Sequence, residues 1–147
     1  MITKQIRLSQ QAKDHLARLK GKTGIQYWNV LSRWALCLSL AEPSRPVDQG
    51  IRPDSNVEMS WHVFGGEYHE VYAALVIERC RIDGVDLDPG SVAREFSLHL
   101  HRGVSYLAAA GFVRSISDLI GLVTKDTRSP DADDSVEMES ERLATIS

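Results

Sequence analysis

One stretch of the chain, residues 26–41, would be apolar around almost its whole circumference as a helix. Only four polar side chains interrupt it after its first residue: Asn29, Ser32, Arg33 and Ser39. Such a helix is normally buried on all sides, but this one is too short and too interrupted to span a membrane. A small chain has little surface with which to cover it, so the sequence predicts that other copies of the chain take part.

Two shorter elements precede this helix. Residues 5–8 alternate polar and apolar side chains, which is typical of a short strand. Residues 9–22 predict a helix, because apolar side chains recur there at helical spacing, at Ala12, Leu16 and Leu19. Ser9 can cap the start of this helix, and Gly21 or Gly24 can end it in the left-handed conformation. The order of strand, helix and helix is that of a ribbon-helix-helix unit.

Positive charge is concentrated in the same part of the chain. Residues 1–33 carry seven lysines and arginines against one acid, Asp14, which gives +6, whereas the whole chain carries −3 at pH 7. A basic strand-helix-helix unit with an apolar second helix is typical of proteins that bind DNA as dimers. A solvated face on a small helical domain is the alternative, and charge alone does not decide between them.

The middle of the chain predicts one loop and further helices. Residues 43–56 are rich in proline and polar residues and indicate a loop, from which Arg45 and Arg52 could reach a phosphate. Residues 57–64 fit either a short strand or an irregular segment before the next helix. Helical patterns then follow over residues 67–83, 88–110 and 112–123.

Two details refine the predicted helix over residues 88–110. Asp88 and Pro89 are a good capping residue and a good first helical residue, so the helix should begin there. Gly103 costs about 1 kcal/mol relative to alanine in a helix interior, which suggests that close packing is needed at that position.

The cysteines and the N-terminus bear on the cellular compartment. Cys37 and Cys80 lie in apolar helical stretches, so we expect buried free thiols of a cytoplasmic protein. The first residues contain no apolar signal core, and no apolar run is long enough to span a membrane.

The composition changes near residue 125. Residues 129–147 carry six acids against one cation, Arg142, and few apolar side chains. A segment of this composition cannot repay the entropy of ordering and should be disordered. The predicted organisation is therefore a mainly α domain over residues 1–124 and a disordered acidic tail over residues 125–147.

Side chains that could carry out chemistry are present but do not form a recognised site. His99 and His101 would lie about 200° apart on a helix, so they would not share a metal ion. Two histidines and two glutamates occur over residues 62–70, without a nucleophile or a third ligand beside them. The sequence therefore predicts no catalytic residue, no metal site and no cofactor.

Three blocks of the chain, in the same order, carry a resemblance to a known family: residues 6–44, 54–75 and 96–107. They resemble the bacterial DNA sulfur-modification protein DndE family. That family acts in DNA phosphorothioation, in which sulfur replaces a non-bridging oxygen of a backbone phosphate.

The resemblance implies a small, mostly helical, cytoplasmic protein that forms a tetramer. It implies binding of duplex DNA, preferably nicked, through surface lysines. It also implies that the sulfur chemistry belongs to partner proteins, namely a cysteine desulfurase, an iron-sulfur protein and an ATPase.

Five basic residues in the matching blocks are the expected DNA-binding residues. Lys13, Lys20 and Lys22 come first because they are the lysines of the matching basic helix, and Arg7 and Arg18 come second. The predicted function is a non-catalytic DNA-binding subunit. Two alternatives stay open: an enzyme acting at the DNA phosphate, such as a nuclease or transferase using His99, His101 or the Glu67–Glu70 cluster, and an assembly subunit whose basic face binds acidic partner proteins.

Overall fold

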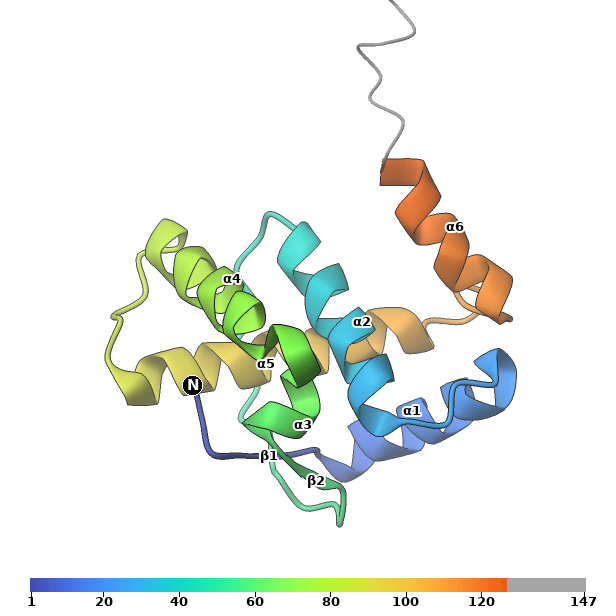
Figure 1. Cartoon of the computed structure of the whole chain (residues 1–147), viewed down its shortest axis with the longest axis horizontal. Coiled ribbons are helices and arrows are strands. Elements are labelled where there is room, and N and C mark those ends of the chain that lie inside the picture. The colour runs from blue at the N-terminus through green and yellow to red at the C-terminus, as the bar shows by residue number, and fades with distance from the viewer. Residues whose placement is uncertain (127–147) are drawn as a thin grey trace, which may run out of the picture.

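The computed structural model describes residues 1–126, and these are mainly helical, as predicted (Figure 1). The elements in chain order are β1 (Gln5–Arg7), α1 (Gln10–Thr23), α2 (Trp28–Ala41), β2 (Glu58–Ser60), α3 (Trp61–Gly65), the 3-10 helix η1 (Gly66–Tyr68), α4 (His69–Ile82), α5 (Pro89–Ala108) and α6 (Ile116–Asp126). Within residues 1–126, no helix is long and apolar enough to cross a membrane. The acidic tail predicted over residues 125–147 lies almost wholly outside the described residues.

The two strands form a small antiparallel ribbon. Ile6 of β1 faces Met59 of β2, and both side chains are buried against the helices. On the exposed side, Arg7 pairs with Glu58 across the ribbon at 2.8 Å. The segment 57–64 therefore contains both a strand and the start of a helix. The strand-helix-helix order is the predicted one, and both strands of the ribbon come from the same chain.

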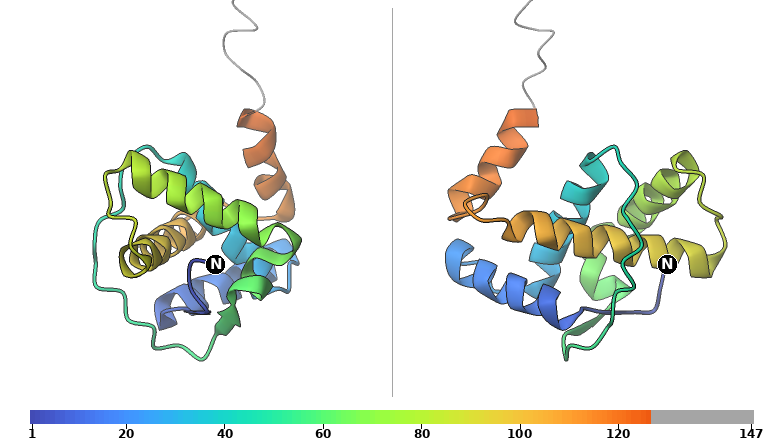
Figure 2. Two further views of the ribbon diagram at one scale, coloured as in Figure 1. Left: turned by 60° about the vertical axis from the view of Figure 1, so that its left-hand side comes forward. Right: turned by 180° about the vertical axis from the view of Figure 1, so that it is seen from behind.

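α2 and α5 form the centre of the molecule. α2 crosses α5, and the view from behind shows α5 running along the back of the fold (Figure 2). Leu31, Ala35 and Leu36 of α2 are completely buried. The crossing is tight at Gly103, where a Cβ atom would lie 1.7 Å from the carbonyl oxygen of Ala35. The sequence expectation that Gly103 serves close packing is thus confirmed.

One side of α2 remains uncovered within the chain, and this is the side that the prediction assigns to other copies of the chain. Cys37 and Ala41 are exposed, and Val30 and Trp34 are only partly buried. These four residues recur at helical spacing and form what we call the outer face of α2. The expectation of a buried Cys37 thiol was wrong because the residue lies on this face, whereas Cys80 is buried as predicted.

The predicted helix ends are mostly confirmed. The Ser9 hydroxyl caps α1 by accepting from the amide of Ala12, and Gly24 ends that helix with a φ of 77°. Asp88 caps α5 by accepting from the amide of Ser91. The predicted helix over 112–123 begins later, at Ile116, because a turn separates it from α5.

Candidate nucleic-acid interface

The basic residues of α1 differ in what surrounds them. Arg18 and Lys22 are exposed and have no hydrogen-bond or ion-pair partner among residues 1–126. Lys13 donates from Nζ to Oδ1 of Asn56 at 2.6 Å. The ammonium of Lys20 lies 3.5 Å from the centroid of the Trp28 ring, and partial burial lowers the pKa of Lys20. Arg18 and Lys22 are therefore the cations most available to a phosphate.

Arg7 is the least available of the five predicted residues. Its guanidinium donates to the Glu58 carboxylate at 2.8 Å and to the carbonyl oxygen of Ser55 at 3.3 Å. A phosphate would have to compete with the carboxylate for this arginine.

Helical spacing divides the α1 side chains into two rows. Gln11, His15, Arg18 and Lys22 follow one another at intervals of four, three and four residues, so they lie along one side of the helix. Lys13 and Lys20 are seven residues apart and lie on another side. The five predicted residues therefore do not form one patch. We call the first set the Arg18 row and the second the Lys13 row.

A groove adjoins the Arg18 row at the start of α1. It encloses about 570 Å³. Its walls are the N-terminal half of α1, the C-terminal half of α5 and residues 44–54 of the loop that joins α2 to β2. Gln11 and His15 line it from α1, Arg52 from the loop and Tyr106 from α5. Sequence reasoning missed this groove, although the two arginines of the loop were a partial signal for it.

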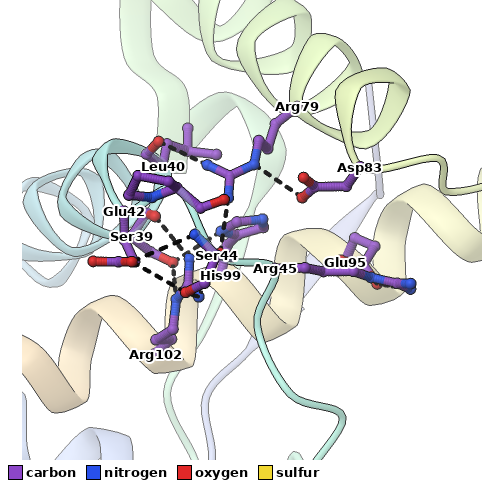
Figure 3. A network of polar contacts seen from close by, with 11 residues as sticks. Ser39, Leu40, Glu42, Ser44, Arg45, Arg79, Asp83, Glu95, His99 and Arg102 are labelled. Atoms are coloured by element: carbon purple, nitrogen blue, oxygen red, sulfur yellow. Dashed lines mark hydrogen bonds and ion pairs between the residues drawn. The ribbon is translucent and has the colours of Figure 1, made fainter.

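Two partly buried arginines hold the beginning of the loop that forms the groove wall (Figure 3). Arg102 donates to the hydroxyl and carbonyl oxygens of Ser39 and to the carbonyl oxygen of Ser44. Arg79 donates to the carbonyl oxygens of Leu40 and Ser44, among others. The bond from Arg79 satisfies the carbonyl oxygen of Leu40 in the last turn of α2, where carbonyl groups lack partners within the helix, and Arg102 adds a donor to the Ser39 carbonyl, which also accepts from the amide of Glu42.

Carboxylates anchor Arg79 and the loop residue Arg45. Arg79 pairs with Asp83 at 2.9 Å, and both side chains are nearly buried. Arg45 pairs with Glu95 at 2.7 Å, where the glutamate is buried and the arginine is exposed. The loop is thus fastened to α4 and α5 at its beginning.

The histidines considered for catalysis take part in structural hydrogen bonds. Because Arg102 donates to the Ser39 hydroxyl, that hydroxyl can donate in turn to Nδ1 of His99, at 2.8 Å. Burial, with a smaller contribution from nearby Arg102, lowers the pKa of His99 to about 4. His99 is therefore neutral at physiological pH.

His101 points to a different partner, as the spacing predicted. Its Nε2 accepts from the amide of Ser9, and its Nδ1 lies 2.8 Å from the carbonyl oxygen of Ser97, to which it can donate. Burial lowers the pKa of His101 as well. The imidazole thus connects α5 to the start of α1.

The remaining candidates lie at the corner between α3 and α4. The rings of His62 and His69 are in contact, with centroids 4.3 Å apart, and Glu67 and Glu70 are exposed. Within residues 1–126, no three His, Cys, Asp or Glu side chains are grouped so that they could hold a metal ion.

Comparison with known proteins places this chain in a family. A family model described as DNA sulphur modification protein DndE matches residues 5–115. No curated protein matches the chain.

Two solved structures share the fold. One is a crystal structure of DndE from Escherichia coli B7A, described as involved in DNA phosphorothioation modification. The two sequences are 22% identical and the TM-score is 0.62. The alignment covers 73% of this chain and 98% of that chain. The other, a DndE mutant with two glycines replaced by lysine, is described as involved in DNA phosphorothioation. It is 18% identical, with a TM-score of 0.56, over 71% of this chain and 96% of that chain.

At these identities the two structures establish the common fold, while the family match rests on the sequence. The match covers all elements from β1 to α5 and ends just before α6. This chain therefore belongs to the DndE family of DNA sulphur modification proteins, a family involved in DNA phosphorothioation.

Proposed function

We propose that this protein is a non-catalytic subunit of the DNA phosphorothioation machinery that binds duplex DNA, with preference for nicks. The observation that carries the proposal is that Arg18 and Lys22, on the exposed side of α1, have no partner among residues 1–126 and lie within the part of the chain that matches the family. Phosphate contacts by such side chains supply most of the affinity in non-specific DNA binding.

The Lys13 row adds a second set of contacts in this proposal. Lys13 would exchange a neutral amide partner for a phosphate, and Lys20 would keep its ring contact with Trp28 while facing solvent on its other side. Arg7 contributes least, because it would have to give up Glu58. All five predicted residues remain candidates, with Arg18 and Lys22 now first.

We further propose that the DNA-binding form is a tetramer. The outer face of α2 has a counterpart along α4 and its capping residue. Tyr68, which caps α4, and Val71, Leu75 and Ile82 of α4 are exposed along one side, and we call these residues the outer face of α4. Tyr72 of α4 lies near Cys37 of the outer face of α2, and the pKa of Tyr72 is raised by burial and also by this cysteine. Exposed apolar side chains gathered on two helices are typical of a protein-protein interface.

The sulfur chemistry is assigned in this proposal to partner proteins: a cysteine desulfurase, an iron-sulfur protein and an ATPase. His99 and His101 are held by Ser39, Ser9 and Ser97, which supports a structural role over an enzymatic one. The protein would present the DNA to these partners in the cytoplasm.

Fluorescence anisotropy with three labelled DNAs tests the proposal. We expect nicked duplex to bind more tightly than intact duplex or single strands, with an affinity that falls as salt rises. Binding of acidic partner proteins without any affinity for DNA would instead identify an assembly subunit. Metal-dependent cleavage of the DNA by the purified protein would identify an enzyme.

A further inference from the structure

We propose that the groove between α1, α5 and the loop of residues 44–54 binds one unpaired nucleotide of DNA. This inference rests on the proposed DNA binding and specifies which part of the DNA the protein contacts most closely. The groove volume, about 570 Å³, lies within the range of pockets that hold small organic molecules, about 300–1,000 Å³.

The side chains along the groove match the chemistry of a nucleotide. Tyr106 offers an aromatic surface at the rim, with 36% of its area exposed, and bases stack on such rings in sites for single strands. The guanidinium of Arg52 has no partner among residues 1–126 and can contact a phosphate. Gln11 and Gln49 supply amide groups that can both donate to and accept from a base edge.

The Arg18 row leads directly into this groove. Gln11 and His15 belong to the row and also line the groove, while Arg18 and Lys22 continue the row beyond it. From Gln11 to Lys22 the helix rises about 16 Å, which is the axial length of about five phosphates on one strand. A strand bound along the row would therefore bring a nucleotide to the groove.

The charges of the groove also favour a polyanion. Three arginines line it, of which Arg45 is paired with Glu95 while Arg52 and Arg102 have no carboxylate partner among residues 1–126, and Asp54 is the one acid among its lining residues. The Asp54 carboxylate accepts from the amide of Gln10 at 2.8 Å, so the positive start of α1 offsets part of its charge.

A second hollow on the other side of the loop provides a contrast. It encloses about 520 Å³ and is lined by three acids, Asp48, Asp86 and Glu95, against two arginines. The two hollows have similar volumes but opposite charge balance, so the groove is the one suited to DNA.

The groove is also preorganised, which limits the entropic cost of binding. Arg102, which lies 5.8 Å from the Tyr106 ring centroid, is fixed by its bonds to Ser39 and Ser44. His101 in the groove wall is fixed by Ser9 and Ser97.

Replacement of Tyr106 tests the inference. The probes are two duplexes of the same sequence, one blunt and one with a short single-stranded overhang that carries 2-aminopurine, whose fluorescence reports base stacking. The unaltered protein should bind the overhang duplex about tenfold more tightly than the blunt duplex, the effect of one stacked base. Tyr106→Ala should abolish this difference and the fluorescence change, while the affinity for blunt duplex and its salt dependence stay the same.

Three further variants make the result specific. Tyr106→Phe keeps the ring and should keep the preference for the overhang. Phe112→Ala removes a similarly exposed ring that does not line the groove, so it should also leave the preference unchanged. Arg52→Ala, in the exposed loop, should weaken binding of the overhang more than binding of blunt duplex.

The outcomes separate this inference from the proposed function. If the unaltered protein binds neither duplex, the proposal that it binds DNA is wrong, and the assignment of the groove to a nucleotide is wrong as well. If it binds both duplexes equally, or if a folded Tyr106→Ala protein retains the preference for the overhang, the groove assignment is wrong while DNA binding stands.

Discussion

Gly103 of α5 lies so close to Ala35 of α2 that an added Cβ atom would overlap the Ala35 carbonyl group, with 1.7 Å to its oxygen. The neighbouring atoms are backbone atoms of a fully buried helix segment, which cannot move aside as a flexible side chain would. The two helices therefore cross with backbone in contact with backbone.

Gly103→Ala should lower the free energy of unfolding by about 1–3 kcal/mol. The methyl group overpacks the helix crossing, and this cost outweighs the better helix propensity of alanine. Thermal unfolding followed by circular dichroism measures this effect. Gly21→Ala is the matched control, since nothing lies within 4 Å of a Cβ at that helical position, and it should be neutral or stabilise by up to about 1 kcal/mol. Equal melting temperatures for the two variants would contradict the interpretation of the crossing.

Leu75→Asp should dissociate the proposed tetramer while leaving each subunit folded. Leu75 is 46% exposed on the outer face of α4, so a charge there is solvated in the free subunit and becomes costly only in an apolar interface. Light scattering gives the mass, and circular dichroism gives the fold. Leu31→Asp is the comparison, because Leu31 is fully buried and that variant should unfold. A monomer mass for the unaltered protein at micromolar concentration would rule out the tetramer.

The two rows of α1 should contribute unequally to DNA binding. Arg18→Ala with Lys22→Ala should flatten the slope of log affinity against log salt by about 0.9 for each phosphate that the variant no longer neutralises. Lys13→Ala with Lys20→Ala should have a smaller effect in the same direction, because those side chains have partners within the protein. Both pairs should weaken binding to all sequences alike and leave the oligomer mass unchanged.

A charge-matched control accompanies these variants. Arg81→Ala with Arg94→Ala removes the same charge from exposed positions outside α1 and should change the salt slope little. If every double variant bound nicked duplex with the slope of the unaltered protein, α1 would not be the DNA-binding element.

Stability should fall as the pH drops from about 6.5 to about 4. The pKa of His99 is lowered to about 4 in the folded protein, from 6.5, so in this window the unfolded chain binds a proton that the folded protein does not. Folding is then opposed by up to about 1.4 kcal/mol per pH unit for one such histidine. Urea unfolding at several pH values measures the slope. His99→Asn, whose side-chain oxygen can accept from Ser39, should reduce the slope, although His101 retains its own contribution.

Deletion of residues 127–147 should leave the melting temperature nearly unchanged, because few apolar side chains occur there to contribute to a core. The deleted segment contains the six acids of residues 129–147. These carboxylates can compete with DNA phosphates for the basic side chains of α1. The truncated protein should therefore bind DNA more tightly at low salt, and the difference should vanish at high salt. Equal affinities at low salt would rule out competition by this segment.

Much of the fold could be predicted because local signals were strong. Ser9, Gly24 and Asp88 each mark a helix end through their own conformational preference or capping group, and each performs that task in the structure. The segment 57–64 could not be resolved in the same way. Its strand depends on hydrogen bonding to β1, about fifty residues earlier in the chain. The pattern of side chains within the segment cannot show which distant strand it will pair with.

The candidate site was harder to predict than the fold. Charge drew attention to the basic helix, but it could not show that Lys13 and Lys20 have partners while Arg18 and Lys22 have none among residues 1–126. Those partners, Asn56 and Trp28, come from other elements. The groove was missed for the same reason, because it forms only where α1, α5 and the loop meet.

The ribbon of β1 and β2 is completed within one chain. A subunit can therefore form its whole sheet before it meets another copy, unlike a protein whose strands pair only across a dimer. Assembly of the proposed tetramer would then follow folding as a separate, concentration-dependent step, and folded subunits would leave one tetramer and join another without unfolding. Mixing labelled and unlabelled protein would show this exchange at a rate set by the apolar interface and independent of the rate of global unfolding.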